Sequence, residues 1–216
     1  MKDEILAELK MTLQCSEPLN FNKASLLQGV IMENISSDYA DVLHNQGLKP
    51  YSQCVCIEGD LTIWYIRTLS LEACKMIIEP LMDDAFIEFD LRHNNQHVKI
   101  VDKELNYVSK DSLFKDFYSS DACRCFKIDF RTPTAFKKNG GYFNFPDIYN
   151  IFNSFMKRYD AVSINDSMCS EETLQQLVDN TSIVSYNLRS VNFSMEGIRV
   201  PAFMGHITIR INGPQT

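Results

Sequence analysis

Long apolar runs are missing from this 216-residue sequence, since none reaches the roughly 18 residues that a membrane-spanning helix requires. Residues 1–11 carry acidic side chains and no extended apolar core, so they do not look like a signal peptide. An excess of positive charge is missing as well, because the formal net charge is −7. The overall field therefore repels phosphate, and any RNA binding must depend on a local basic patch. We expect a cytoplasmic protein that does not enter a membrane.

Metal-ligand spacings are also missing. The seven cysteines include two Cys-x-Cys pairs, Cys54/Cys56 and Cys123/Cys125, but no Cys-x-x-Cys pair and no paired histidines accompany them. Residues two apart on a strand share one face, so we interpret these pairs as reduced core residues. A structural zinc ion is the less favoured alternative. We expect no catalytic metal and no other cofactor.

The sequence does contain enough apolar residues for a folded core, with 45% hydrophobic and 11% aromatic residues. Residues 9–15 alternate apolar and polar side chains, which is typical of a strand with one buried face. A helix follows, and Ser25 and Gln28 have the spacing of a capping box at its start. A second, shorter helix is predicted to end near His44.

The rest of the first half completes a recognisable order. Residues 51–57 and 61–68 predict a hairpin, and Ser70 is placed to cap a helix that Pro80 limits. Residues 87–91 alternate again and predict a strand. Strand, helix, two strands, helix and strand is the ferredoxin-like order, which RNA-recognition domains also use.

Residues 92–120 hold a further strand pair and a short helix, and we interpret them as the connection to a second half. That half repeats the pattern of the first, and its last strand should follow Thr216. Its predicted segments are a strand at 126–130, a loop at 132–146, helices that begin after Asp147 and Ser170, and strands at 183–193 and 200–211. We predict an α+β fold of two tandem ferredoxin-like domains, residues 1–120 and 121–216, the second incomplete at its C-terminus.

Residues 26–52, 130–159 and 200–214 carry a resemblance to a known family. With the doubled fold, the chain resembles the CRISPR-associated endoribonucleases that cut precursor CRISPR RNA within its repeats, a branch of the repeat-associated mysterious protein superfamily. The resemblance implies metal-independent cleavage by the 2′-hydroxyl, which leaves guide RNAs with 2′,3′-cyclic phosphate ends. It also implies a glycine-rich loop near the C-terminus, and this sequence ends before such a loop.

The resemblance names CRISPR repeat RNA as the partner, with other CRISPR effector subunits and a second copy of the chain as further candidates. Two alternatives stay open. One is a non-cleaving subunit that holds repeat RNA within an effector complex. The other is an unrelated ferredoxin-like sensor or assembly domain, which the acidic charge would suit.

The candidate catalytic residues follow from the same resemblance. His44 matches the family's catalytic histidine, which acts as a general acid or base, and Lys49 matches a lysine that stabilises the phosphate. The helix C-terminus favours a charged imidazole and so the acid role. The family often uses a tyrosine where this sequence has Met32, and Tyr51 is the preferred substitute, with Tyr39 second. The alternative for His44 is a surface capping residue.

The acidic excess lies in residues 1–120, so we expect the RNA contacts to come mainly from the second half. A loop with adjacent lysines can bring ammonium groups close to phosphates. The candidate RNA-binding residues are Arg131, Lys137, Lys138, Arg189 and Arg199. Ordinary solvated surface charge is the alternative for each. His206 shares a strand face with polar residues and could face RNA, although a hydrogen-bonded structural histidine is the favoured interpretation.

Overall fold

The computed structural model describes residues 5–91, 96–119, 124–138, 140–163, 167–195 and 198–212. The chain divides into two compact units, Met1–Phe117 and Tyr118–Thr216. Within the described stretches, neither unit has a helix that is long and apolar enough to span a bilayer.

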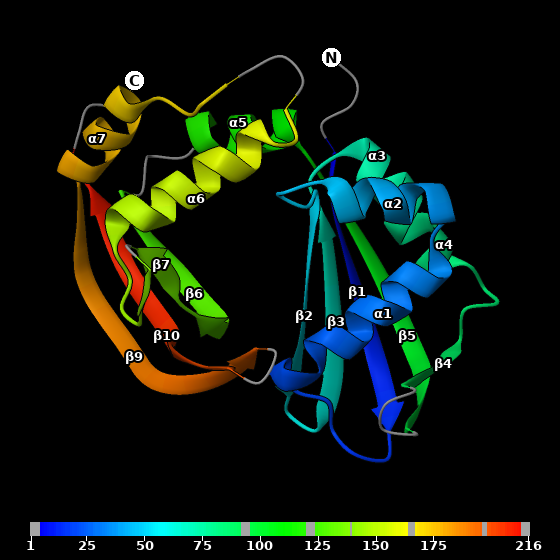
Figure 1. Ribbon diagram of the computed structural model, residues 1–216. Coiled ribbons are helices and arrows are strands. Elements are labelled where there is room, and N and C mark those ends of the chain that lie inside the picture. The colour runs from blue at the N-terminus through cyan, green and yellow to red at the C-terminus, as the bar shows by residue number, and fades with distance from the viewer. Residues whose placement is uncertain are drawn as a thin grey trace. The chain divides into compact units, whose positions relative to one another are not determined.

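A five-stranded antiparallel sheet forms the first unit, in the order β2-β3-β1-β5-β4 (Figure 1). Its strands are β1 (Ile5–Cys15), β2 (Tyr51–Glu58), β3 (Leu61–Thr68), β4 (Glu88–Leu91) and β5 (Gln96–Ser109). The alternation in β1 decides its two faces, because Leu9 and Met11 are fully buried while Lys10 and Thr12 stay partly exposed. The turn between β2 and β3 is made by Gly59 at a φ of 61°.

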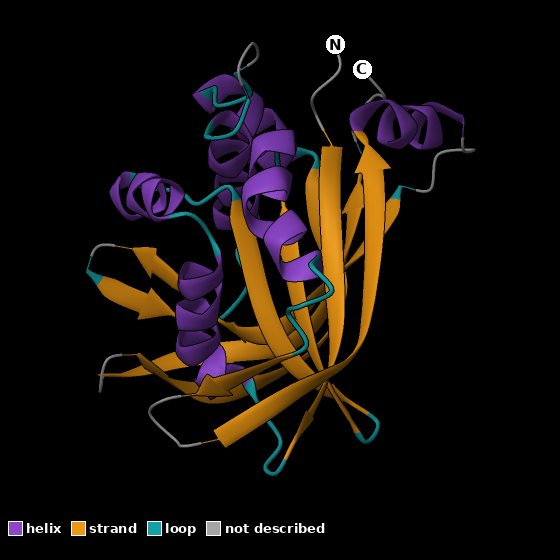
Figure 2. Ribbon diagram, turned by 90° about the vertical axis from the view of Figure 1, so that its right-hand side faces the viewer, coloured by secondary structure: helices purple, strands orange, loops and turns teal. Residues whose placement is uncertain are grey.

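Helices cover one face of this sheet, as the two ribbon views show (Figures 1 and 2). They are η1 (Phe21–Lys23), α1 (Ala24–Asn34), α2 (Ser37–Asn45), α3 (Leu71–Ala73), η2 (Cys74–Ile78) and α4 (Glu79–Met82), and α5 (Lys110–Ser119) follows β5. Leu27 and Ile31 of α1 share a core cluster with Trp64 and Ile66 of β3. This cluster fixes α1 on the sheet, and α2 follows α1 directly.

The helical run after Ser70 passes through Pro80 without ending. The Ser70 hydroxyl accepts a first-turn backbone N–H at 3.1 Å, which confirms the predicted cap. Segment η2 is a π-helical turn, in which the Glu79 N–H bonds to the Cys74 carbonyl. Pro80 then stands in the first turn of α4, where a missing N–H costs nothing.

The end of the first unit differs from the prediction. Residues 96–109 form one strand, β5, which pairs with β1 from Ile5↔Ser109 to Cys15↔Val98. Strand β4 is a short edge strand that pairs only with β5 in the described sheet. The fourth ferredoxin-like strand is therefore β5 and not residues 87–91. Alternation alone could not decide this, because edge and central strands share the period of two.

The second unit has a three-stranded sheet in the order β6-β10-β9, within the part of the chain that the structure describes. Its elements are β6 (Cys125–Thr134), β7 (Phe136–Lys138), β8 (Gly141–Phe143), α6 (Ile148–Asp160), α7 (Glu171–Asp179), β9 (Thr181–Met195) and β10 (Ile198–Ile211). Ile151 of α6 joins Ile207 and Ile209 of β10 in its core. Residues 132–146, predicted as a loop, contain the end of β6 and the hairpin of β7 and β8. The predicted α+β class of tandem ferredoxin-like units is confirmed.

Candidate functional site

Helix α2 presents His44 to solvent. The helix begins after Ser36, whose hydroxyl accepts the Tyr39 backbone N–H at 3.3 Å. Tyr39 and Leu43 are buried on its inner side, while His44 is exposed in its last turn. The spacing of apolar residues thus anchors the helix and leaves the imidazole accessible.

Lys49 lies at the same helix end as His44. Its Nζ donates to the Leu43 carbonyl and, at 2.6 Å, to the Gln46 carbonyl. The last carbonyls of a helix have no partner within the helix, so a cation there satisfies them and complements the helix dipole. The structure therefore brings His44 and Lys49 together and gives Lys49 a structural task, the capping of α2.

The two candidate phenols belong to the core of the first unit. Tyr51 is 5% exposed and Tyr39 is 6% exposed. Burial raises the pKa of Tyr51, and burial followed by the charges of Glu72 and Tyr51 raises the pKa of Tyr39 to about 12. Both phenols are protonated at neutral pH. In this structure they pack α2 and β2 against the core, and their part in catalysis remains a prediction.

A partly buried polar network, which sequence reasoning missed, includes Tyr51. The Tyr51 hydroxyl accepts a hydrogen bond from Gln28 Nε2, and Gln53 Nε2 donates to Gln28 Oε1 at 3.3 Å. Trp64 Nε1 donates to Gln53 Oε1 at 2.8 Å. Gln28 therefore does not act with Ser25 in a capping box, and α1 begins at Ala24 without a side-chain cap. The network ties α1 to β2 and β3. Strand β2 begins at Tyr51, soon after His44 and Lys49 in the sequence.

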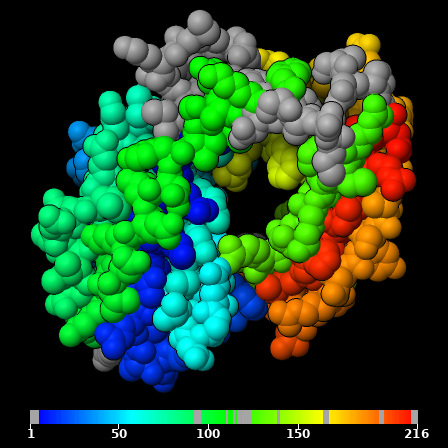
Figure 3. Space-filling model, turned by 180° about the vertical axis from the view of Figure 1, so that it is seen from behind, coloured from blue at the N-terminus to red at the C-terminus, as the bar shows by residue number. Residues whose placement is uncertain are grey.

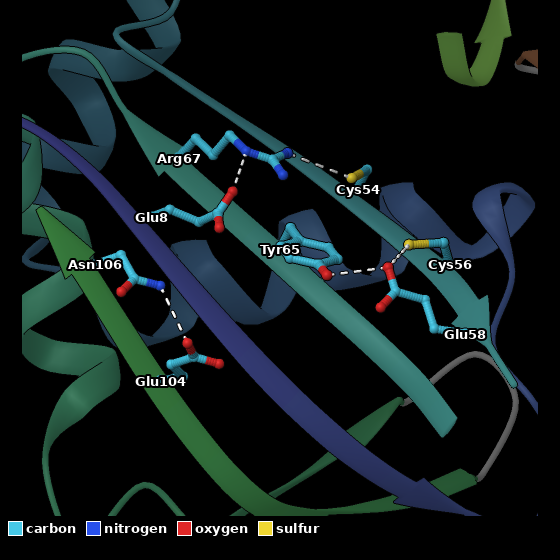
Figure 4. Close-up of polar contacts among 8 residues, drawn as sticks. All are labelled: Glu8, Cys54, Cys56, Glu58, Tyr65, Arg67, Glu104 and Asn106. Atoms are coloured by element: carbon cyan, nitrogen blue, oxygen red, sulfur yellow. Dashed lines mark hydrogen bonds and ion pairs between the residues drawn. The ribbon is translucent and has the colours of Figure 1, made fainter. Parts of the chain in front are cut away.

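The sheet face opposite the helices in the first unit is polar and acid-rich (Figure 4). Arg67 Nε lies 2.5 Å from Glu8 Oε2, and Lys10 Nζ lies 3.3 Å from Glu104 Oε2. Lys10 and Arg67 are thus each paired with a carboxylate. The Tyr65 hydroxyl donates to Glu58 at 3.0 Å. This face has no excess of positive charge for RNA.

Cys54 and Cys56 share one face of β2, as predicted for residues two apart on a strand (Figure 4). The interpretation of the pairs as core residues is wrong, because Cys54 and Cys56 are only partly buried on this open face and Cys125 is exposed. Cys123 lies outside the described residues. Among the residues that the structure describes, no three His, Cys, Asp or Glu side chains are grouped so that they could hold a metal ion.

The candidate RNA-binding residues of the second unit fall into three places. Arg131 on β6 and Arg189 on β9 line one hollow of the sheet. Lys137 is exposed on β7, with its Nζ 6.0 Å from the centre of the Tyr142 ring. Lys138 is also in β7, and its side chain lies outside the described part of the structure. Arg199 is exposed near the start of β10.

The hollow also contains His206, for which a structural role was the favoured interpretation, and Met204, which the sequence did not mark. His206 is partly exposed in it, and its Nδ1 is 3.9 Å from Asp129 Oδ1. Met204 lies between the two arginine strands, 3.9 Å from Arg189 Nη2. For His206 and Met204, the sequence offered only the alternation of polar residues around His206 as a signal.

Three comparisons place the chain among known proteins. Residues 128–214 match the family model described as CRISPR-associated endoribonuclease Cas6. The Cas6 endoribonuclease of Mycobacterium tuberculosis is 30% identical over 218 residues, which cover 99% of this chain and 69% of that protein. The Cas6 endoribonuclease of Streptococcus thermophilus is 30% identical over 188 residues, which cover 87% of this chain and 76% of that protein.

Solved structures share the fold. A Cas6 product complex superposes with a TM-score of 0.76 at 17% identity, covering 96% of this chain and 85% of that chain. Cas6 of Thermus thermophilus superposes with a TM-score of 0.67 at 17% identity, covering 100% of this chain and 86% of that chain.

Proposed function

Because this chain belongs to the family of CRISPR-associated endoribonucleases Cas6, we propose that it cleaves precursor CRISPR RNA within the repeats, without a metal ion. The observation that carries the proposal is the exposed imidazole of His44 at the capped end of α2. An imidazole can exchange a proton near neutral pH, and the Lys49 cap holds the backbone beside it in one place.

The reaction needs two proton transfers and no external nucleophile. The 2′-oxygen attacks the neighbouring phosphorus and loses its proton, while the bond from phosphorus to the 5′-oxygen breaks and that oxygen gains a proton. The products are a 2′,3′-cyclic phosphate and a 5′-hydroxyl. His44 serves as the acid or the base in this step. Lys49 adds positive charge near the phosphate and keeps the end of α2 in position.

The second unit supplies contacts to the repeat RNA in this proposal. Arg131, Lys137, Lys138, Arg189 and Arg199 neutralise backbone phosphates. The protein acts in the cytoplasm, where the precursor RNA is made. Other CRISPR effector subunits and a second copy of this chain are the further partners that the family suggests.

Repeat RNA from the CRISPR array of the same genome provides the test. His44→Ala should lower the single-turnover cleavage rate by about 10²-fold or more and leave RNA affinity within twofold, because the imidazole acts on protons and not on binding. Asp41→Ala, at an exposed position on the same helix, is the matched control and should cleave at the wild-type rate.

Two further measurements distinguish the proposed cleavage from its alternatives. An RNA with deoxyribose at the cleaved position should bind and stay intact, and excess chelator should not slow cleavage of the natural RNA. Binding without cleavage by the wild-type protein would support the non-cleaving subunit instead. A wild-type rate for His44→Ala would remove this histidine from the mechanism.

A further inference from the structure

The hollow on the second unit gathers side chains from all three strands of its sheet. In the β-ladder His206 of β10 lies opposite Asp129 of β6, and Met204 lies opposite Arg189 of β9. Arg131 of β6 also lines the hollow. Ile207 and Ile209 take the other face, which packs on α6. The hollow is therefore on the face away from the helices, where bands of β6, β10 and β9 run side by side (Figure 3).

Backbone geometry builds this hollow at Gly205. The register of β10 against β6 shifts between Phe203 and Gly205, as in a β-bulge. Gly205 has a φ of 124°, and a Cβ atom there would stand 2.1 Å from the Asn187 carbonyl oxygen. Only glycine allows this approach of β9 and β10. Between the pairs Phe203↔Thr134 and Gly205↔Phe130, residues 131–133 of β6 lie opposite the single residue Met204 of β10.

The charge of the hollow is positive. Lys127 Nζ lies 3.0 Å from Asp129 Oδ1, so the one carboxylate of the group already has a cationic neighbour. Arg131 and Arg189 are both exposed and add two guanidinium groups. Adjacent strands lie about 4.8 Å apart, so the two arginine backbones flank β10 at about 10 Å. Two long side chains can reach one anion across that distance.

We propose that this hollow is a phosphate-binding site for the RNA strand, in which Arg131 and Arg189 bind one phosphodiester and His206 adds a third hydrogen-bond donor. The inference rests on the proposed function and adds a site and a binding residue to it. Met204 lines the hollow between the arginine strands, with its Sδ 3.9 Å from Arg189 Nη2. Arg guanidinium groups donate paired hydrogen bonds to phosphate oxygens, which suits them to this contact.

His206 completes the site as a hydrogen-bond donor. Its ring is partly exposed in the hollow, with Nδ1 3.9 Å from Asp129 Oδ1. An imidazole N–H can donate to a phosphate oxygen.

The first test measures the affinity of the full chain for a short, mixed-sequence, single-stranded RNA by fluorescence anisotropy. Arg131→Ala and Arg189→Ala should each weaken binding by about tenfold and reduce the salt slope by about 0.7–0.9 units. Arg210→Ala removes one charge from the same sheet face outside the hollow and should stay within twofold of wild type. Equal losses in all three variants would mean general electrostatics and would overturn the site.

The second test removes the imidazole from the hollow. His206→Ala should weaken binding by about fivefold, because one hydrogen bond to the phosphate is lost. The Arg210→Ala control should again stay within twofold of wild type. If His206→Ala binds as tightly as wild type, His206 is not a ligand of the phosphate. Unchanged thermal unfolding of each variant shows that the fold is intact.

Cleavage assays distinguish this inference from the proposed function. Wild-type binding by Arg131→Ala and Arg189→Ala, with cleavage still dependent on His44, would overturn the hollow and leave the nuclease proposal standing. Weakened binding in both arginine variants would support the hollow even if the wild-type protein does not cleave repeat RNA.

Discussion

A single ammonium group closes the end of α2 beside His44. Lys49 is outside the helix, yet it donates to the carbonyl of Leu43 in the last turn and to that of Gln46, which follows the helix. The sequence marked Lys49 as a phosphate ligand and could not show this cap, because the distance from Nζ to these carbonyls depends on how residues 46–49 turn back.

Replacement of Lys49 should therefore affect stability as well as cleavage. We expect Lys49→Ala to lower the free energy of unfolding by about 1–3 kcal/mol, because the hydrogen bonds from the charged Nζ to the carbonyls of Leu43 and Gln46 are lost. Urea denaturation measures this change. Lys49→Arg keeps the charge and is the matched variant. If Lys49→Ala lowers kcat with little change in KM, Lys49 acts by positioning or by stabilising the phosphate; no change in stability would contradict the cap.

His97 of β5 contacts two carboxylates, and these affect the pKa of its imidazole. Its Nδ1 lies 2.9 Å from Asp90 Oδ1 and its Nε2 lies 3.3 Å from Glu88 Oε2, so one side chain of β5 contacts two carboxylates of the edge strand β4. The hydrogen bond to Asp90, followed by the charge of Glu88, raises the pKa of His97.

The pH dependence of the β4–β5 hairpin follows from this raised pKa. The stabilising contribution is fully present below the ordinary histidine value of about 6.5 and is lost as the pH rises through the higher folded pKa. His97→Gln should therefore destabilise the protein at low pH and have little effect at high pH. Melting temperatures across that range test this, and a constant difference between the two proteins would contradict it.

Among the elements, those with a local sequence signal were predicted well. Strand β1, the β2–β3 hairpin with Gly59, and the helices after Ser70 and Ser170 all follow from alternation, turn residues and caps, and the Ser170 hydroxyl accepts the Thr173 N–H at 3.4 Å. These signals act over a few residues. Such segments need no knowledge of what they pair with.

The elements that depend on distant partners were missed or misassigned. Strand β5 is long because it pairs with β1 over its full length, and the β7–β8 hairpin forms in a segment rich in lysine and glycine. Gln28 looked like a capping residue and instead reaches Tyr51 and Gln53 across α1 and β2. Pairing and side-chain reach are tertiary properties, so periodicity could not reveal them.

The close approach of β9 and β10 at Gly205 gives a prediction at the scale of these two strands. Gly205→Ala should lower the free energy of unfolding by about 2 kcal/mol or more, because the new Cβ would collide with the Asn187 carbonyl and the φ of 124° strains any side chain. Gly29→Ala is the control, since nothing lies within 4 Å of its Cβ position in α1. That change should be neutral or should stabilise by up to about 1 kcal/mol. Chemical denaturation of both variants measures these effects. Equal stabilities of Gly205→Ala and Gly29→Ala would contradict the close approach of the two strands.

At the scale of the whole molecule, a protein with a net charge of −7 must bind RNA through an uneven distribution of charge. The first unit pairs Lys10 and Arg67 with carboxylates on its open sheet face, whereas the hollow of the second unit has more cations than carboxylates. RNA affinity should therefore depend on where a charge is removed and not on the total charge.

Two double variants with the same change in net charge test this expectation. Lys137→Ala with Lys138→Ala should weaken RNA binding and reduce the salt slope by about one to two units. Lys75→Ala with Lys99→Ala removes two exposed lysines from the first unit and should leave affinity nearly unchanged. Salt titrations of RNA binding give both slopes. The same slope for the two variants would show that only total charge matters.

The π-helical turn at Cys74–Ile78 makes this part of the chain sensitive to its length. In an α-helix the ring of Pro80 would collide with the carbonyl four residues earlier, at Met76. The wider π-helical turn ends with the hydrogen bond from the Glu79 N–H to the Cys74 carbonyl. Pro80 therefore falls in the first turn of α4. Loss of one residue here would move the proline into a helix interior and rotate Leu81 out of the core. Among homologues we expect side-chain changes in this turn but a fixed spacing between Ser70 and Pro80.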